Sequence, residues 1–394
     1  MIINRSIKNN IKVDYAYRFL SYLNISSAIW VLYMSFKGMS LIQIGLIEGI
    51  FHITGLISEV PSGALADLMG RKKSIVIGRF LSLVSAIMLL YSNTFLMFVI
   101  AFIVSALSYN LNSGSEEALV YDSLKLMGRE DEYLKLNGRL SLIIEIAQGL
   151  AVFIGGYLAN KNFELSYLLA VLIAIFTLGT ALLFKEVVPL ENKKENVNFK
   201  SHFKEIFELL KSNKKLVNFL LFFSSLYAFS ATVYFYGQQH LSNRGYSPFE
   251  ISLIFLVNGA ISALGAVISS GLYKRYKNKV IIIIPIMLSL SMIAVSISSG
   301  NILFLSIWMA SFLTAIMQPI TSNILNSIIE SKHRATIISV ESMFYSLSMI
   351  ILFPISGFIG DNTSLEFTFI ILGILSLILS IYEYFKIKNN LDLW

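Results

Sequence analysis

Ionisable side chains lie inside several long apolar stretches of this chain. Glu48 and His52 are four residues apart, a spacing that places both on one face of a helix. Glu145 and Glu341 are enclosed by apolar residues in two later stretches. A carboxylate in a medium of low dielectric can take up a proton near neutral pH, and histidine titrates in that range unaided. These four residues are therefore candidates for coupling proton movement to another process.

Each of these candidates also has a simpler interpretation. A carboxylate can pair with a nearby cation such as Arg18 or Arg139, or it can face a water-filled vestibule. Glu59, seven residues after His52, is expected at the membrane interface. Arg18 either pairs with a carboxylate across a cavity or extends its charge to the interface, and of these we prefer the second.

The composition indicates a membrane protein. The chain has 394 residues, of which 56% are hydrophobic and 14% are charged, against roughly 25% charged residues in a soluble domain. The net charge of +7 comes from cations in short connections between apolar runs, a pattern that fixes membrane orientation and does not indicate nucleic-acid binding. The chain contains no cysteine, which excludes disulfides and thiol chemistry. No metal site, cofactor or enzymatic motif is expected.

The apolar runs predict an all-α membrane protein with twelve transmembrane helices in two pseudo-symmetric six-helix bundles. The expected domains are 1–186, a cytoplasmic linker at 187–213 with an amphipathic helix, and 214–394. An apolar run of about 20 residues crosses the hydrocarbon core. The predicted spans are 14–36, 41–66, 74–92, 95–117, 139–159, 165–184, 216–240, 249–272, 280–299, 302–328, 335–359 and 365–385.

The cations sort by side when the N-terminus is placed inside. Lys37, Lys161 and Arg244 then fall outside, and the other 28 of the 31 cations fall on the cytoplasmic side. This asymmetry is typical of a multi-pass protein of the cytoplasmic membrane. We expect both termini to be cytoplasmic.

The two halves contain related sequences. The segment 37–47, which begins Lys-Gly-Met-Ser, aligns with 244–254, which begins Arg-Gly-Tyr-Ser. The basic strip at 63–73 has a degenerate copy at 271–279. Two parallel six-span repeats around a substrate site are a known transporter plan.

The basic strip resembles the signature of the major facilitator superfamily in the loop between spans 2 and 3. The matching residues are Gly63, Asp67, Gly70, Arg71 and Lys72, and Leu68 replaces the basic residue usual after the aspartate. The segments 59–63 and 113–122 are similar to those of a bacterial, drug-exporter-like branch. The resemblance covers nearly the whole chain and implies secondary transport by alternating access.

The resemblance implies that spans 1, 4, 7 and 10 line a central cavity. Polar residues in these spans are then substrate-cavity candidates: Asn110, Asn112, Tyr227, Tyr234, Gln318 and Asn323. Tyrosine rings there could contact a cationic substrate. Hydrogen bonding between helices is the alternative for each, worth about 0.6 kcal/mol on average.

The resemblance also implies a gate in the basic strip. Gly63, Asp67, Gly70 and Arg71 are the gating candidates, with Asp122 as a second partner for Arg71. A charge pair formed in only one access state biases the equilibrium between states. The alternative is that the cations only anchor topology and contact anionic lipid.

Proton-coupled efflux of lipophilic or cationic compounds is the expected function, driven by the proton gradient. The span-4 arginine of proton-coupled members would fall near Asn110, and the span-5 antiporter signature is reduced to residues such as Gly155 and Gly156. An importer or facilitator of a sugar, organic acid or other metabolite therefore stays open, as does a transporter-like receptor. The expected partners are a small-molecule substrate, protons and membrane lipids, with the monomer as the functional unit.

Overall fold

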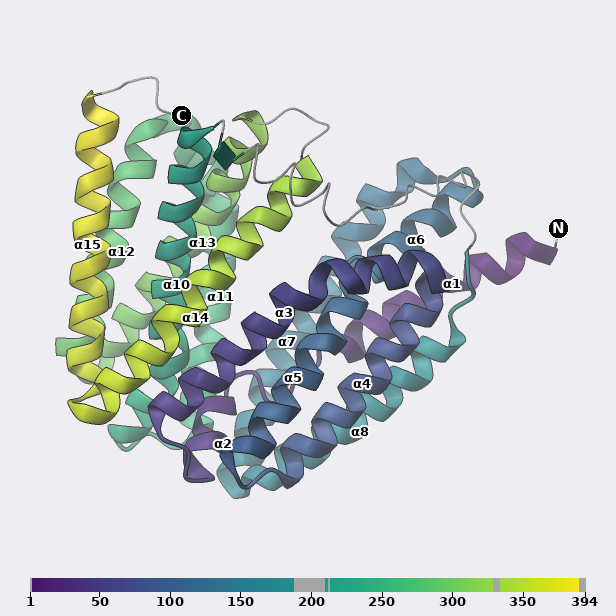
Figure 1. Cartoon of the computed structure of the whole chain (residues 1–394), viewed down its shortest axis with the longest axis horizontal. Helices are drawn as coiled ribbons and strands as arrows, with labels where there is room; N and C mark the ends of the chain where they lie inside the picture. Colours follow the sequence, from purple (N-terminus) through teal and green to yellow (C-terminus); the bar gives the residue numbers. More distant parts are fainter. Residues whose placement is uncertain (1, 188–209, 212, 329–333, 390–394) are drawn as a thin grey trace. The chain divides into compact units, whose positions relative to one another are not determined.

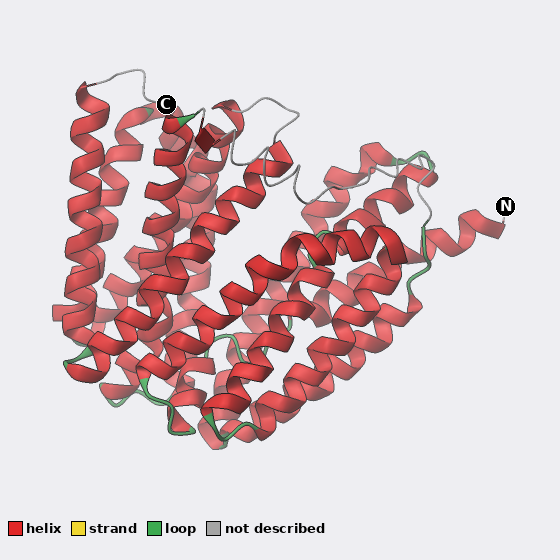
Figure 2. Ribbon diagram, in the orientation of Figure 1, coloured by secondary structure: helices red, strands yellow, loops and turns green. Residues whose placement is uncertain are grey.

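Helices make up all the regular structure in the part of the chain that the computed structural model describes (Figure 2). The described residues are 2–187, 210–211, 213–328 and 334–389. The amphipathic helix predicted within 187–213 lies almost wholly outside them. Figure 1 labels the elements along the chain.

The first half of the chain folds into short and long helices separated by tight turns. They are α1 (Ile2–Tyr22), α2 (Trp30–Phe36), α3 (Leu41–Met69), α4 (Arg71–Tyr91), α5 (Phe95–Asn112), α6 (Ser115–Leu126), the 3₁₀ turn η1 (Glu130–Glu132), α7 (Tyr133–Lys161) and α8 (Phe163–Leu183).

The second half consists of long helices only, within the residues described. They are α10 (Lys214–Asn243), α11 (Pro248–Tyr276), α12 (Asn278–Ile297), α13 (Gly300–Ile328), α14 (Arg334–Asn362) and α15 (Leu365–Asn389).

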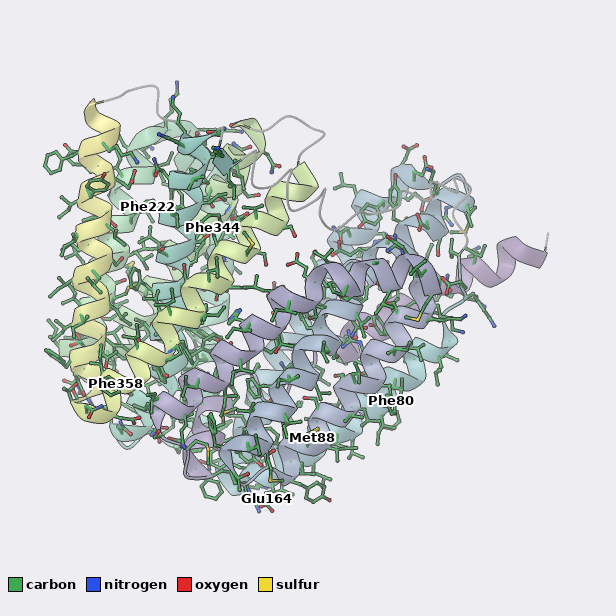
Figure 3. The ribbon with its side chains drawn as sticks, viewed as in Figure 1. Phe80, Met88, Glu164, Phe222, Phe344 and Phe358 are labelled. Carbon is green, nitrogen blue, oxygen red and sulfur yellow. The ribbon has the colours of Figure 1, made fainter. Side chains whose placement is uncertain are left out.

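Eleven stretches of the described helices are long and apolar enough to cross a membrane. These helices carry large apolar side chains that no other described residue covers, such as Phe176 on α8, which is more than half exposed. Phe80 on α4 and Phe358 on α14, both labelled in Figure 3, are also more than half exposed. Such faces are stable against lipid and would be costly in water. The fold is therefore that of a helical multi-pass membrane protein.

The first predicted span, 14–36, is not one helix. Helix α1 ends at Tyr22 and α2 begins at Trp30. The residues between include Asn24, Ser26 and Ser27, whose short polar side chains compete with helical hydrogen bonds, and the Ser26 hydroxyl donates to Asn24 Oδ1 at 2.9 Å. Irregular backbone is tolerated at membrane depth where protein buries it, and Ile25 of this segment is 1% exposed.

Glycine in α7 makes room for this break. A Cβ added at Gly155 would overlap the carbonyl oxygen of Ile25. The hydroxyl of Ser166 on α8 donates to the Gly155 carbonyl at 3.0 Å. The glycine pair at 155–156 therefore has a packing role, because it lets irregular backbone lie directly against a helix.

The fourth predicted span, 95–117, is also interrupted. Helix α5 ends at Asn112, and α6 begins at Ser115 after the pair Ser113 and Gly114. Gly114 has a φ of 74°, a left-handed conformation that favours glycine. The first and fourth spans of the N-terminal half are thus both discontinuous.

The chain divides into two compact units, and each unit includes a short segment from the other half of the sequence. Unit 1 comprises residues 1–38, 50–198 and 247–252, and unit 2 comprises 39–49, 199–246 and 253–394. In unit 1, α1 packs on α7 and α8, and α4 packs on α5 and α8. In unit 2, α10 packs on α13 and α14, and α12 packs on α13 and α15. The domain boundaries predicted at 186 and 214 stay a prediction.

The internal sequence repeat has matching local geometry. Gly38 and Gly245 have φ values of 85° and 88°. Ser40 and Gln43 form a reciprocal pair of side-chain to backbone hydrogen bonds, and Ser247 and Glu250 form the same pair. Each is a capping box, which satisfies free N–H groups at the start of α3 and α11.

Candidate functional site

Five side chains of unit 1 form a buried charged cluster. Glu116, in the first turn of α6, accepts from Arg79 Nη2 of α4 at 2.7 Å and from the Tyr17 hydroxyl of α1. Its second oxygen lies 3.1 Å from Arg18 Nη1. Arg18 Nε is 3.4 Å from Asp14 Oδ1, one turn earlier in α1. We call these five residues the inner charge cluster.

Packing of α1 holds the inner charge cluster in place. The Asn10 amide donates to the Ser123 hydroxyl of α6 at 3.0 Å and to the Lys185 carbonyl at 2.9 Å. The Lys185 N–H returns a hydrogen bond to Asn10 Oδ1 at 2.8 Å. The ring of Tyr17 meets that of Phe184 edge to face at 5.1 Å between centroids. α1, α6 and the end of α8 are thereby fixed to one another.

The structure corrects one prediction for these residues and adds two residues to the site. The preference for Arg18 at the membrane interface is wrong, because its side chain is 7% exposed and paired with Glu116. From the sequence we predict Arg79 only as a cytoplasmic cation, and we predict no role for Glu116. A signal was available, because both lie inside predicted spans, where an uncompensated charge is costly.

The basic strip has one of its predicted pairs. Arg71 Nη2 lies 3.0 Å from Asp67 Oδ1. The carboxylate of Glu186 accepts from the Lys72 N–H at 3.2 Å, at the positive end of α4. Gly70 has a φ of 96°, and a Cβ there would overlap Glu186. Gly70 therefore serves both the turn and the approach of this carboxylate.

The other two gating candidates, Gly63 and Asp122, form no side-chain hydrogen bond or ion pair with this strip among the described residues. Gly63 lies within α3, where a Cβ would meet open space. Asp122 of α6 is half-buried, and Arg71 and Lys125 are the cations that act on it electrostatically. A gating role for these residues stays a prediction.

Hydroxyl groups and a carboxylate meet in unit 2. The Tyr227 hydroxyl of α10 is 2.7 Å from Thr321 Oγ1 of α13. One turn along, Ser230 Oγ is 2.8 Å from Thr314 Oγ1. Glu341 of α14 acts electrostatically on Tyr227. No described lysine or arginine lies within ion-pair distance of Glu341.

Glu48 lies near tyrosines of the same unit. It acts electrostatically on Tyr345 of α14 and Tyr236 of α10. Tyr345 is one helical turn after Glu341, so α14 presents both toward this region. Unit 2 therefore contains a stripe of two carboxylates and three tyrosines, composed of Glu48, Tyr236, Tyr345, Glu341 and Tyr227. We call it the acidic tyrosine stripe.

Glu48 and His52 lie one helical turn apart in the continuous helix α3 (Leu41–Met69). Their joint role in proton coupling stays a prediction. The ring of His52 meets that of Phe51 edge to face at 5.7 Å between centroids.

Three predicted site residues make internal contacts. Asn110 Nδ2 donates to the Gly55 carbonyl at 2.6 Å and to Ser58 Oγ at 2.8 Å. Asn112 is buried and donates to the Ser108 carbonyl at 2.8 Å. The ring of Tyr234 meets that of Phe255 at 4.7 Å. The contacts of Asn110 join α5 to α3 and fit the alternative of hydrogen bonding between helices, whereas the hydrogen bond of Asn112 lies within its own helix α5. A role for these residues in the substrate cavity stays a prediction.

Three other predicted residues are exposed. They are Glu145 on α7, and Gln318 and Asn323 on α13. Exposure of a polar residue in a membrane-spanning helix fits a water-filled cavity better than lipid. Their roles in coupling and substrate binding stay predictions.

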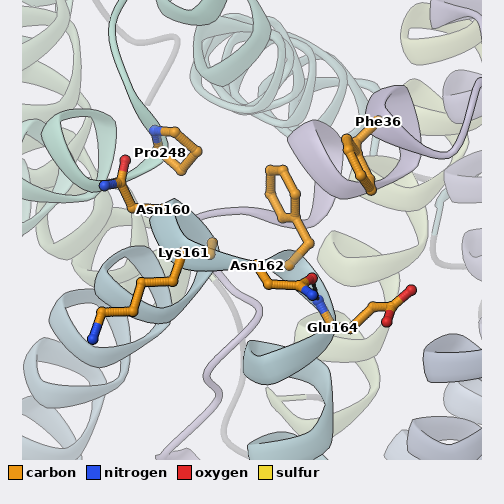
Figure 4. A pocket seen from close by; sticks show the side chains of 8 residues that line it. Phe36, Asn160, Lys161, Asn162, Glu164 and Pro248 are labelled. Carbon is orange, nitrogen blue, oxygen red and sulfur yellow. Dashed lines mark hydrogen bonds between the residues drawn. The ribbon is translucent and has the colours of Figure 1, made fainter.

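The described pocket of unit 1 lies away from all these residues. It has a volume of about 410 Å³ and is lined at the turn between α7 and α8 by Asn160, Lys161 and Glu164, with Phe36 and Pro248 beside them (Figure 4). Glu164 is paired with Lys37 at 3.3 Å. The pocket contains no predicted site residue.

Clusters of charged residues inside a multi-pass helical fold are typical of membrane transport proteins. The family model of the Major Facilitator Superfamily matches residues 15–288 and 239–389, and the chain belongs to this superfamily of secondary transporters. It is not an enzyme. The drug-exporter branch suggested by the sequence is not part of this finding.

Two curated relatives span nearly the whole chain. An uncharacterized MFS-type transporter of Bacillus subtilis (strain 168), YxaM, is 28% identical over 93% of this chain and 94% of its own. A second, from Methanocaldococcus jannaschii, is 23% identical over 97% and 99%.

Solved structures share the fold. A mutant of the nucleoside transporter NupG has a TM-score of 0.84 at 15% identity, covering 95% of this chain and 98% of that one. A D-xylose–proton symporter has a TM-score of 0.73 at 15% identity and covers 96% of each. At such identities the likeness shows the fold alone.

Proposed function

We propose that this protein exports lipophilic cations in exchange for protons. The observation that carries this proposal is the acidic tyrosine stripe of unit 2. Glu341 has no described cation within ion-pair distance, and Tyr227 and Tyr345 lie on the helices around it. A half-buried carboxylate near tyrosine side chains attracts a cation through its charge, and the tyrosine rings can add cation–π contacts.

The same carboxylate accounts for exchange. A carboxyl group that binds either a proton or a cationic substrate, but not both, makes the two compete. Substrate then leaves when the proton arrives, which is the logic of antiport. Glu341 and Glu48 are the residues we assign to this competition, with Tyr227 as a substrate contact.

The test uses purified protein in proteoliposomes and ethidium as a lipophilic cation. An imposed pH gradient should drive ethidium against its own gradient in the unaltered protein. Glu341→Gln should abolish the gradient-driven part of the flux, because glutamine can neither ionise nor bind a proton. Ser342→Ala, a change at the exposed neighbour of Glu341, is the matched control and should retain the flux.

A neutral, hydroxyl-rich substrate is the second candidate. The paired hydroxyls of Tyr227 with Thr321 and of Ser230 with Thr314 could exchange hydrogen bonds with a sugar or nucleoside. Solved neighbours with this fold include a nucleoside transporter and a xylose–proton symporter. Uptake of uridine or xylose by the unaltered protein, with no ethidium flux, would favour this function over the first.

A further inference from the structure

We propose that Asp14 of the inner charge cluster is a proton-binding residue of this transporter, and that Arg18 transmits its protonation to α6. The inference deepens the proposed function, since it rests on proton coupling and supplies a second proton site in unit 1. It starts from the unequal way in which the cluster holds its two carboxylates.

Glu116 has donors on both oxygens. Arg79 and the Tyr17 hydroxyl donate to Oε1, and Arg18 lies 3.1 Å from Oε2. Charge-assisted hydrogen bonds of this kind are short and strong. Both oxygens of Glu116 are thus occupied by donors from α1 and α4.

Asp14 has far weaker support. Its side chain is fully buried, with 0% exposure. Its Oδ1 is 3.4 Å from Arg18 Nε, a long hydrogen bond, and its Oδ2 has no partner among the described residues. A proton placed on Oδ2 breaks no hydrogen bond and removes a buried negative charge. Asp14 Oδ2 is therefore a position in the cluster where a proton can bind without displacing a donor.

The groups around Asp14 come from three helices. Arg18 lies on its own helix α1, Glu116 and the exposed Glu117 lie on α6, and Tyr133 lies on α7. The two carboxylates next to it on α6 disfavour a further negative charge, and Arg18 opposes them. The balance at Asp14 thus depends on where Arg18 is held.

Arg18 links protonation of Asp14 to the charge balance of the whole inner charge cluster. When Asp14 is ionised, the charges of Asp14, Glu116, Arg18 and Arg79 cancel. When Asp14 binds a proton, the cluster has a net charge of +1, and Arg18 and Arg79 both depend on Glu116. A buried charge without compensation is strongly unfavourable, so protonation of Asp14 favours a rearrangement of Arg18.

The inner charge cluster lies beside the breaks in two spans, so a rearrangement of Arg18 acts on both. Arg18 lies in the last turns of α1, before the break that precedes α2, and Glu116 lies in the first turn of α6, after the break at Ser113 and Gly114. Discontinuous helices are the elements that bind coupling ions in many transporters. Proton occupancy of Asp14 therefore changes the strength of the ion pair between Arg18 and Glu116, which connects α1 to α6.

Infrared spectroscopy tests this assignment without a transported substrate. The full-length protein is labelled with ¹³C at aspartate side-chain carboxyl groups and titrated from about pH 9 to about pH 5. Among the described aspartates only Asp14 is buried, Asp122 is half-buried, and Asp67, Asp131 and Asp361 are exposed. We expect one label-shifted band of a buried carboxylic acid to appear as the pH falls.

Two variants assign the band. Asp14→Asn should remove it, and Asp131→Asn, which changes an exposed aspartate of η1, should leave it in place. Arg18→Lys should move the band to a higher pH by about one unit, a tenfold change in proton affinity, because the shorter side chain leaves Asp14 without its cation. This variant serves if Asp14→Asn does not fold.

The outcomes are decisive in either direction. Absence of a label-shifted band in the unaltered protein would overturn the proposal, and so would a band that persists in Asp14→Asn or does not move in Arg18→Lys. A positive result with no ethidium flux in proteoliposomes would refute the proposed export of lipophilic cations and leave the proton site intact.

Discussion

Glu116 is the residue on which the buried charge of unit 1 depends. It is the common partner of Arg18, Arg79 and the Tyr17 hydroxyl, and it stands 7% exposed. Removing one member of a buried ion pair leaves the others charged and desolvated. The side chain is thus structural in the resting protein whatever the proton occupancy of Asp14.

Glu116→Gln should destabilise the protein by about 3–5 kcal/mol, because two buried arginines lose their shared anion. Unfolding of the purified protein in detergent, followed by circular dichroism against temperature, measures the change. Glu117→Gln is the matched control on the same turn of α6 and should shift stability by about 0.5 kcal/mol or less. Equal stability of the two variants would contradict the cluster described here.

The break between α1 and α2 shows how the end of a helix positions the inner charge cluster. Asn24, Ser26 and Ser27 end α1, and Gly155 of α7 admits the carbonyl of Ile25. Apolar periodicity predicted one span over 14–36, because hydropathy counts residues and takes no account of local hydrogen bonds. The break depends on a glycine more than 100 residues away, which no local pattern in the chain reveals.

Gly155→Ala should therefore be destabilising by about 1–3 kcal/mol, the usual effect of overpacking. Gly138→Ala in the same helix is the control, because a Cβ there meets open space. That change should be neutral or stabilising by up to about 1 kcal/mol, since alanine favours a helix over glycine. Thermal unfolding of both variants distinguishes a packing role of Gly155 from a general sensitivity of α7 to substitution.

The repeated turns at the starts of α3 and α11 are another element that sequence anticipated. Alignment of 37–47 with 244–254 matched Gly38 with Gly245 and Ser40 with Ser247, and both pairs have the same geometry. A carboxylate from α14 adds to the first of them, where Asp361 accepts from the N–H groups of Leu41 and Ile42 at 2.9 and 2.8 Å. Such long-range capping cannot be read from a local motif.

Asp361→Asn should weaken this cap by about 0.5–2 kcal/mol, the range for loss of a capping carboxylate. Asn362→Ala, at the neighbouring exposed position, is the comparison. Hydrogen exchange at the first turn of α3, measured by mass spectrometry, should rise in the first variant and stay unchanged in the second. Unchanged exchange in both would show that the capping box of Ser40 and Gln43 suffices.

At the scale of the whole molecule, the sequence predicted the class, the helical architecture and the superfamily. It succeeded because long apolar runs and the basic strip are local signals. It succeeded less at the site, because Arg18, Arg79 and Glu116 come from three separate spans and only the folded chain brings them together. Asn110 and Asn112 each have a hydrogen-bond partner inside the protein, and their place in a substrate cavity stays a prediction.

The basic strip is where transport as a whole can be perturbed without touching the substrate region. Asp67 pairs with Arg71 at 3.0 Å and is more than half exposed. If this pair biases access, Asp67→Asn should slow turnover about two- to tenfold with little change in ethidium binding, corresponding to roughly 0.4–1.4 kcal/mol. Parallel flux and binding assays measure this, and a variant with lower expression but normal turnover per molecule would favour topological anchoring.

Proton movement driven by substrate tests the central claim most directly. Proteoliposomes with no imposed pH gradient are given an ethidium gradient, and a pH-sensitive dye in the lumen reports protons. Exchange predicts that protons move opposite to ethidium, and that Glu341→Gln abolishes the dye signal. Ethidium flux at the same rate with no proton movement would contradict coupling, and with it the function proposed for this transporter.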